Sequence, residues 1–431
     1  MSPGLAVLMG VFLGLAVLGA PVGLAMLAAG FAYLFATGQD IGLAVDQTMN
    51  SLYNSYILIA VPMFILVANT MNTGGVIERL FDFGSAMVGR SRGGLAHVNV
   101  VANLIFSGMS GSAVADAAGP GLVIARMMMR DGRYSPGFAA AVSAASATIG
   151  PIVPPSIPMI FYALIANTSV GALFLGGLLP AALMAVSLMA AIAYLARRKG
   201  LPRGQSVPWR AYPRIVVRAA PALALPVILL GIIYTGVATP TEAAAIAAFY
   251  ALALAHLVYR SAGLKDLLAV LAQTVRNTAT VGLIIVGAFV FNYVIAAEQV
   301  PQALQAMLAA WHPAPLTFFA AVNVIFLALA CVLDAITMLL VLVPLLVPLA
   351  VSLRLDPVHF GVVIILNMMI GLALPPHGLL LFVMNSLTGA PLGAIFREVL
   401  PLVGALLVVL VAVTLVPGLV TAIPTAFGYG R

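Results

Sequence analysis

Hydroxyl residues, glycines and one acid cluster early in the chain in a pattern that could bind a cation. Residues 107–116 read Ser-Gly-Met-Ser-Gly-Ser-Ala-Val-Ala-Asp, which places Ser110 and Ser112 in one tight turn ahead of Asp116. Hard cations prefer hydroxyl, carboxylate and carbonyl oxygens and take about six of them. The stretch 150–156 contains three prolines, and proline frees carbonyls because it has no N–H to donate. The two stretches together indicate a site for a cation such as Na⁺.

A second break that contains an acid lies in the last quarter of the chain. It runs from Cys331 through Asp334 to Thr337, and the proline-containing stretch 371–376 follows it. Carboxylates inside apolar segments are costly to bury and mark functional sites by default. This acid and Asp116 could equally cap the first turn of a helix, and capping does not exclude ion binding. The small residues of the first break could also serve close helix packing.

The two breaks belong to a pattern that occurs once in each half of the chain. Asn103 precedes the Pro-Pro pair at 154–155, and Asn323 precedes the pair at 375–376, at spacings that differ by a single position. Each pair is followed by a further proline, Pro180 or Pro401, at the same spacing in both copies. A chain that repeats the places where a membrane helix must break is typical of transporters with a site between two halves.

Composition predicts that these elements lie in a membrane. Hydrophobic residues make up 63% of the 431 residues, charged residues only 7%, and the mean hydropathy is +1.16. Windows of about 20 apolar residues recur along the whole chain, as in a polytopic helical membrane protein. The short alternating segments typical of barrel strands are absent from the sequence. A single cysteine excludes disulfides within the chain.

The net charge of +7 is not the pattern of a nucleic-acid-binding protein. Seven of the 19 Lys and Arg residues lie in residues 197–218, which contain no acid. The positive-inside rule predicts that this loop is cytoplasmic. No Lys or Arg occurs before Arg79, so Met1–Leu18 lacks the charged start of a signal peptide.

Apolar windows predict helices throughout, with a re-entrant hairpin in each half. Val76–Val88 and Leu264–Val275 are amphipathic and too polar to span, so we expect them at the membrane interface. Val98–Phe106 and Leu316–Val332 lead into polar breaks, which persist at membrane depth only where protein or a water-filled cavity satisfies the backbone. The other expected helices are Leu5–Leu18, Val22–Phe35, Ile57–Met71, Phe138–Ile149, Ile157–Ile165, Val170–Leu195, Ala219–Tyr234, Glu242–Leu257, Val281–Ala297, Thr337–Val351, Val362–Leu374, Gly378–Leu387 and Gly393–Val416.

A rival motif is the Gly-x-Ser-Gly sequence at 108–111, which occurs in intramembrane serine proteases. Such an enzyme needs a histidine base on another helix, for which His256, His312 or His377 could serve. The pattern is weak in a chain with 40 glycines, and a protease needs neither the repeat nor the matched proline pairs. We therefore expect a transporter and no enzymatic activity.

The ordered set of motifs resembles the large membrane subunit of TRAP (tripartite ATP-independent periplasmic) transporters over essentially the whole chain. The matching segments are Ser107–Gly119, Gly150–Ser156, Gly231–Ala244, Leu333–Asp334, Val343–Pro348 and Asp356–Gly361. The resemblance implies a periplasmic substrate-binding protein and a small four-helix membrane subunit as partners. It also implies Na⁺-driven import of a small carboxylate, such as a dicarboxylate, a keto acid or sialic acid, across the bacterial inner membrane. No small subunit precedes Met1, so we expect it to be a separate chain.

Carried over by residue, the resemblance implies two sodium sites and a substrate site. The first sodium site falls at Ser110, Ser112, Gly150, Val153 and Pro154, with Asp116 as a further candidate, and the second at Asp334, Thr337, Gly371 and Pro375. Candidate substrate-binding residues are Ser107, Ser156, Asn167, His377 and Thr388. The chain departs from the family at Leu374, where Thr is common, and at His377, where Val is frequent. A missing hydroxyl at Leu374 weakens the second site unless its ligands are mainly carbonyls.

The expected fold is an all-α polytopic membrane protein of two inverted repeats with re-entrant hairpins and broken helices. In an elevator-type arrangement these form a scaffold and a transport domain. The predicted units are scaffold helices and an amphipathic arm, a first transport repeat, a cytoplasmic loop, a second scaffold unit and a second transport repeat, at residues 1–92, 93–196, 197–218, 219–312 and 313–431. The alternative functions are a proton-coupled or channel-like anion transporter and, less favoured, the protease.

Overall fold

The computed structural model describes residues 2–73, 75–130, 132–204, 207–311, 313–330 and 333–429. Its elements in these ranges are helices, and the only β-type pairing described is an isolated bridge between Arg92 and Arg203. Seven helices are long and apolar enough to cross a membrane within the described chain, or eight if one bent pair counts as a span. The expected all-helical polytopic fold is therefore confirmed. Cys331 and His312 lie outside the described residues.

The helices of residues 1–92 and 219–312, the predicted scaffold units, are called the scaffold helices below, and the N-terminal ones come first. Helices α1 (Pro3–Val17) and α2 (Val22–Ala36) are separated at residues 18–21, where the sequence predicted a break. They are followed by α3 (Gly42–Tyr53), a short 3₁₀ turn at Tyr56–Ile59 and α4 (Ala60–Thr73). The amphipathic helix α5 has the predicted bounds, Val76–Val88, and buries its apolar stripe against α6 (Gly94–Ser110) and α12 (Tyr212–Tyr234).

The first repeat begins with a helical hairpin. Helix α6 (Gly94–Ser110) ends in a tight turn at Gly111, and the chain returns through α7 (Ala113–Asp116), a π-helical turn (Ala117–Gly121) and α8 (Leu122–Met129). Gly111 has a φ of +60°, and a Cβ there would lie 2.4 Å from the carbonyl oxygen of Pro155. Only glycine suits both the left-handed backbone and this close approach.

A broken helix faces this hairpin. Helix α9 (Pro136–Ala147) continues into a 3₁₀ turn at Gly150–Ile152, and α10 (Ile157–Ala166) leaves the break at an angle of 41°. The long helix α11 (Val170–Arg198) completes the repeat. It extends into the predicted basic loop, whose other end is helical from Trp209 onward.

The second half of the scaffold contains one helix that the sequence divided. Helix α12 spans Tyr212–Tyr234, and α13 (Pro240–Ala253) begins with a capping box between Thr239 and Glu242. The segments Leu264–Val275 and Val281–Ala297 were expected as two helices, but α14 runs without interruption from Leu264 to Ala297. That expectation was wrong because the polar residues between the two segments include no Gly or Pro, so nothing interrupts the backbone hydrogen bonds. Helix α15 spans Val300–Trp311.

The second repeat mirrors the first in the order of its elements. Helix α16 (Pro315–Leu329) and α17 (Ala335–Ser352) flank the second break, and α18 (Pro357–Gly371) and α19 (Leu379–Thr388) flank the second proline pair. Helices α20 (Leu392–Leu415) and α21 (Gly418–Ala426) follow. The peptide bond within each proline pair, Pro154-Pro155 and Pro375-Pro376, is cis.

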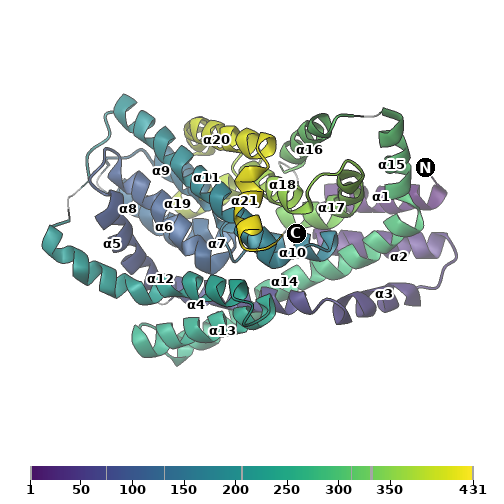
Figure 1. The fold of residues 1–431 in the computed structure, drawn as a ribbon, viewed down its shortest axis with the longest axis horizontal. Helices are drawn as coiled ribbons and strands as arrows, with labels where there is room; N and C mark the ends of the chain where they lie inside the picture. The colour runs from purple at the N-terminus through teal and green to yellow at the C-terminus, as the bar shows by residue number, and fades with distance from the viewer. Residues whose placement is uncertain are drawn as a thin grey trace.

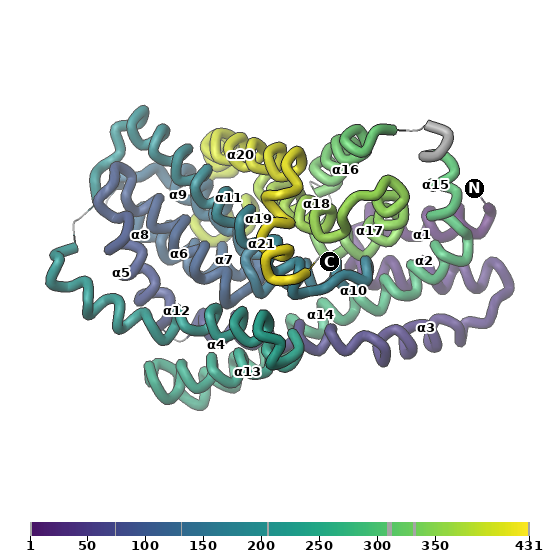
Figure 2. The backbone as a smooth tube through the Cα atoms, viewed as in Figure 1, coloured from purple at the N-terminus to yellow at the C-terminus, as the bar shows by residue number. Residues whose placement is uncertain are grey.

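The two repeats pack into one body beside the scaffold helices. Figure 1 shows α20 above α9 and α11, and α14 running from beside α4 toward α2 and α3. Helix α14 contacts α2, α3 and α4 of the scaffold and also α17 of the second repeat. The tube in Figure 2 shows the purple N-terminal helices α1 to α3 beside this green helix. Helix α14 therefore forms much of the boundary between the scaffold and the repeats.

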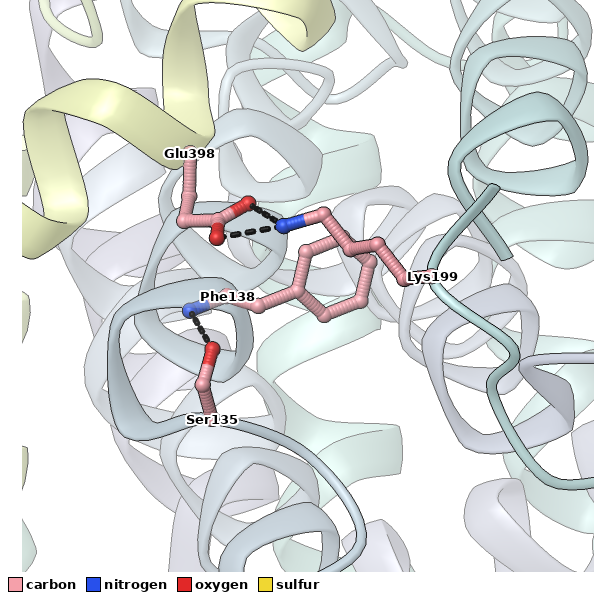
Figure 3. Close-up of polar contacts among 4 residues, drawn as sticks. All are labelled: Ser135, Phe138, Lys199 and Glu398. Atoms are coloured by element: carbon pink, nitrogen blue, oxygen red, sulfur yellow. Dashed lines mark hydrogen bonds and ion pairs between the residues drawn. The ribbon is translucent and has the colours of Figure 1, made fainter. Parts of the chain in front are cut away.

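An ion pair joins the repeats at one end. Lys199, which follows α11, pairs with Glu398 of α20. The ammonium group also lies 5.3 Å from the ring centre of Phe138 in α9 (Figure 3). Ser135 caps the start of α9 by accepting a hydrogen bond from the Phe138 N–H over 3.3 Å. Residues from α9, α11 and α20 thus meet around one cation.

Candidate ion and substrate site

A cavity of about 620 Å³ lies where the two repeats meet the scaffold. The tip of the first hairpin contributes Ser110 and Ser112, and the start of α17 contributes Asp334. The proline break of the first repeat contributes Pro151 and Pro158. Helices α4 and α14 form the scaffold wall. Segments from both halves of the sequence therefore border one space, as the duplicated pattern predicted.

Asp116 lies next to this cavity and is fully buried. Ser107 Oγ donates a hydrogen bond to Asp116 Oδ2 over 2.9 Å, and Ser110 Oγ donates to Oδ1. Ser107 Oγ also lies 2.6 Å from the carbonyl oxygen of Asn103. No Lys or Arg pairs with this carboxylate among the described residues. Among the described residues, the side chains that hold this acid are the hydroxyl groups of Ser107 and Ser110.

The broken helix closes over the same carboxylate. A Cβ at Gly150 would lie 2.3 Å from Asp116 Oδ2, so the backbone of the 3₁₀ turn touches the acid. A Cβ at Gly108 would lie 3.8 Å from the carbonyl oxygen of Pro154, which places the hairpin beside the proline pair. Val153 leaves the 3₁₀ turn in an extended conformation with a ψ of 131°. The hairpin and the break therefore bring together oxygen atoms of hydroxyl, carboxylate and carbonyl groups.

Ser112 and Ser156 have capping roles in this arrangement. Ser112 caps α7 by accepting a hydrogen bond from the Ala115 N–H over 3.4 Å, and it also lines the cavity. Ser156 is fully buried, accepts from the Met159 N–H over 3.2 Å and donates to the carbonyl of Pro151. Both hydroxyl groups are held at the N-termini of short helices that begin at the breaks.

The second repeat places Asp334 as the cap of α17. Its Oδ1 accepts from the backbone N–H groups of Ile336 and Thr337, each over 3.1 Å, and its Oδ2 accepts from the Thr337 hydroxyl. Thr337 is fully buried, whereas Asp334 lines the cavity. The helix-capping interpretation thus describes the geometry of this acid, whose carboxylate oxygens still have lone pairs to offer a ligand.

Gly371 and Pro375 lie on the broken helix of the second repeat. A Cβ at Gly371 would lie 2.2 Å from Ala330 Cβ, so α18 presses against the end of α16. The carbonyl of Gly371 accepts from the Leu374 N–H over 3.0 Å, and Pro375 is half-buried in the turn that follows. Leu374 places an apolar side chain here, so only backbone groups of this turn offer oxygen atoms.

The five candidate substrate residues are not part of the cavity wall described above. Ser107 and Ser156 are buried behind it. Asn167 ends α10 in a left-handed conformation, and Thr388 ends α19 with its hydroxyl 2.5 Å from the carbonyl oxygen of Met384. His377 is exposed in the second proline turn. The structure brings the hydroxyl and acid residues together but leaves Asn167, His377 and Thr388 at separate helix ends.

Polar residues of the scaffold line the cavity and were not identified from the sequence. Helix α4 contributes Asn69 and Asn72, and α14 contributes Gln273, Asn277 and Thr280. The two amides of each helix are at i and i+3 or i+4 spacing, which places them on one helix face. That spacing, inside apolar helices, was the available signal. It was overlooked because α14 was divided at these residues.

Hairpins and broken helices from two halves that share one cavity define a secondary transporter. The model of one family, described as "Tripartite ATP-independent periplasmic transporter, DctM component", matches residues 9–419. The chain belongs to this TRAP transporter family.

Curated relatives agree with this assignment. The sialic acid TRAP transporter large permease SiaM of Vibrio cholerae is 40% identical over 97% of this chain and 98% of its own. The C4-dicarboxylate TRAP transporter large permease DctM of Pseudomonas aeruginosa is 40% identical over 86% and 87%. The sialic acid TRAP transporter permease SiaT of Haemophilus influenzae is 36% identical over 94% of this chain, which spans 66% of that longer protein. The protein is thus a multi-pass inner-membrane permease and not an enzyme.

The same fold is seen in a solved transporter. The Alcanivorax borkumensis YdaH transporter superposes with a TM-score of 0.63 over 96% of this chain and 98% of its own, at 14% identity. At this identity the similarity concerns the fold alone.

Proposed function

We propose that this permease uses a sodium gradient to import a small organic carboxylate. The observation that carries the proposal is the shared cavity, which Ser110 and Ser112 border from the first repeat and Asp334 from the second. A site between two duplicated halves can be opened to either side of the membrane by moving the repeats relative to the scaffold. An elevator-type movement of the repeats past α14 is the form that we propose for this step.

Two groups of oxygen atoms support sodium sites. The first contains the Asp116 carboxylate, the hydroxyls of Ser110 and Ser112 and the backbone from Gly150 to Pro154. The second contains Asp334 and Thr337, and the family resemblance adds the carbonyls of Gly371 and Pro375 as further ligands. Hydroxyl, carboxylate and carbonyl oxygens suit a hard cation. No described cluster of three His, Cys, Asp or Glu residues suits a transition metal.

Binding of Na⁺ would favour binding of the substrate in two ways, by neutralising negative charge and by ordering the hairpins. The acids that border the cavity repel a carboxylate, and bound Na⁺ removes this repulsion. It would also hold each hairpin against its broken helix and so complete the pocket between the tips. Such coupling requires that ion and substrate together favour the same state.

Two partners are part of the proposal. A periplasmic binding protein would deliver the carboxylate, and a small four-helix membrane subunit would complete the scaffold. The family name and the V. cholerae and P. aeruginosa relatives, named as large permeases, support the existence of further components.

Reconstitution in liposomes tests the sodium sites. The variants Ser112→Ala and Thr337→Ala should each raise the Na⁺ concentration needed for half-maximal uptake, by about tenfold for one lost ligand. An unchanged Na⁺ dependence in both variants would contradict the assignment of these sites.

Proton coupling is the second candidate, because Asp116 is fully buried and has no basic partner among the described residues. A proton could neutralise this carboxylate in place of Na⁺. Uptake driven by an imposed pH gradient in choline buffer would favour it, whereas uptake that requires Na⁺ at constant pH would exclude it.

A further inference from the structure

Two loops that join scaffold helices to the first repeat are bonded to each other. One loop connects α5 to α6, and the other connects α11 to α12. The Gly93 N–H donates to the carbonyl oxygen of Pro202 over 2.9 Å, and the Gly204 N–H donates to that of Ser91 over 3.4 Å. A Cβ at Gly204 would lie 2.1 Å from the carbonyl oxygen of Gly89. Backbone contacts therefore fix the position of the basic loop against the loop that precedes α6.

The two loops bring five exposed arginines together. Arg92 and Arg203 form the isolated antiparallel bridge, so their side chains lie next to each other. Arg90 Nη2 donates to the carbonyl oxygen of Val207 in the other loop over 3.3 Å. Two further arginines are four residues apart around the start of α12, on one helix face. We call this set the arginine surface, and its members are Arg90, Arg92, Arg203, Arg210 and Arg214.

The arginine surface has positive charge without a protein counter-charge. Among the described residues none of its members is in an ion pair, since the pair described there joins Lys199 and Glu398. Like charges directly opposite each other in an antiparallel pair are destabilising, and Arg92 and Arg203 are in this position. An anion between the two guanidinium groups would remove the repulsion. Guanidinium groups bind phosphate in a bidentate way, so a phosphate suits this surface.

Exposed apolar side chains lie beside the arginine surface. Trp209 is 82% exposed, Met87 of α5 is 60% exposed and Val217 of α12 is 70% exposed. The Tyr212 hydroxyl donates to the carbonyl oxygen of Ala86 over 2.6 Å and so joins the start of α12 to the end of α5. Figure 1 shows these two helices at the same end of the molecule. Tryptophan is enriched at the membrane–water interface, and amphipathic helices such as α5 lie there. A ligand with both a phosphate and apolar chains matches these neighbours.

We propose that the arginine surface binds the headgroup of an anionic phospholipid such as phosphatidylglycerol. The phosphate lies between Arg92 and Arg203, and the acyl chains cover Trp209 and Val217. The positive-inside rule predicts that this face is cytoplasmic, and anionic lipids of that leaflet attract basic residues near the membrane surface. The bound lipid holds together the two loops through which the scaffold helices continue into the first repeat. This site is separate from the cavity and does not depend on sodium coupling.

Lipid titration tests the proposal. The full-length chain is purified in detergent together with its small membrane subunit, and the thermal midpoint is followed as lipid is added to the micelles. Ligand-induced stabilisation gives the relative affinities. We expect phosphatidylglycerol to bind about tenfold or more tightly than phosphatidylcholine, because only the first has a net negative charge. Equal stabilisation by the two lipids would overturn the proposal. Equal stabilisation by glycerol phosphate, which has the headgroup charge and no acyl chains, would also overturn it.

A double variant tests which arginines bind the lipid. Arg92→Gln together with Arg203→Gln should weaken phosphatidylglycerol about tenfold or more and leave phosphatidylcholine unchanged. Without lipid this variant should unfold at the same or a higher temperature, because the like-charged pair is gone. Replacing both arginines by Lys should keep part of the affinity, since the charge remains but the bidentate geometry is lost.

A second double variant is the matched control for net charge. Arg354→Gln together with Arg397→Gln removes two exposed arginines from other parts of the chain. We expect its affinity for phosphatidylglycerol to stay within about twofold of the wild type, because the arginine surface is intact. If the control loses as much affinity as the variant of Arg92 and Arg203, the lipid responds to net charge alone and the assigned site is wrong. An unchanged affinity in the variant of Arg92 and Arg203 would overturn the proposal as well.

Discussion

Asn292 of α14 donates a hydrogen bond over 3.0 Å to the carbonyl oxygen of Leu340 in α17. The residue one turn later in α17 is Pro344, which has no N–H, so the helix itself cannot satisfy this carbonyl. A scaffold side chain thus completes the backbone of the second repeat. Pro348 frees the carbonyl of Pro344 in the same way, one turn further along.

This pair predicts a measurable coupling between scaffold and repeat. The variant Asn292→Ala should destabilise the protein by about 1 kcal/mol, because it leaves a carbonyl unpaired within the membrane. In a Pro344→Ala background the helix regains its own donor, and the same change should cost much less. Unfolding of all four proteins in one detergent gives the double-mutant cycle. Additive costs would show that the value of this hydrogen bond does not depend on the donor missing at Pro344, which would contradict the account.

The ion pair around Phe138 predicts how the two repeats are held together. Lys199→Glu should lower stability by up to about 1 kcal/mol, since the pair is partly exposed and now carries like charges. The exchange Lys199→Glu with Glu398→Lys should restore most of the loss, apart from the contact of the cation with Phe138. Thermal midpoints of the single and double variants check this. If the thermal midpoint does not recover in the double variant, the loss of stability comes from packing and not from charge.

The close packing around Gly150 predicts that a larger side chain at this position disturbs the site sterically, without any change of charge. A Cβ at this position would overlap Asp116 Oδ2 at 2.3 Å, so Gly150→Ala should displace the acid and cost about 1–3 kcal/mol. It should also raise the Na⁺ concentration needed for uptake. Gly404→Ala in α20, where a Cβ meets nothing within 4 Å, is the matched control and should be neutral or stabilising. Equal behaviour of the two variants would contradict the proposed contact.

Glu298 predicts a dependence of stability on pH at the end of α14. Hydrogen bonds from the Ser2 hydroxyl and, over 2.8 Å, from the Tyr33 hydroxyl lower the pKa of this carboxyl. A lowered pKa means that the stabilisation is complete above the ordinary pKa of a glutamate. It is lost as the pH falls through the pKa of the folded state. Glu298→Gln should therefore be less stable than the wild type near neutral pH and should lose less stability on acidification. Parallel pH curves for the two proteins would exclude the effect.

The parts of the site that could be predicted from the sequence are those that depend on local residue types. The two Pro-Pro pairs mark helix breaks, whereas single prolines such as Pro180 and Pro344 lie inside continuous helices. The paired breaks and the grouping of Ser110, Asp116 and Gly150 could therefore be foreseen. The convergence of both halves on one cavity followed from the duplication. The proline pairs and the acid-containing breaks are local features of the sequence, and they occur in both halves.

The scaffold wall could not be foreseen with the same reasoning. Asn72 lies in α4 and Asn277 in α14, two helices that are far apart in the sequence and meet only in the folded protein. Neither segment alone therefore contains a pattern that predicts their common cavity. Polarity near residue 277 was taken as the end of a helix, although α14 continues through it. For Asn167, His377 and Thr388 the role in substrate binding stays a prediction.

Uptake by proteoliposomes at constant pH, with an inward Na⁺ gradient, tests the central claim most directly when wild type is compared with Asp116→Asn. Asparagine keeps the size of the side chain and an acceptor for Ser107, but it removes the charge that would bind Na⁺. We predict steep sodium activation in the wild type and its loss in the variant, with the protein still folded. Uptake that is as fast in choline as in Na⁺, or an unchanged sodium curve in Asp116→Asn, would contradict the account.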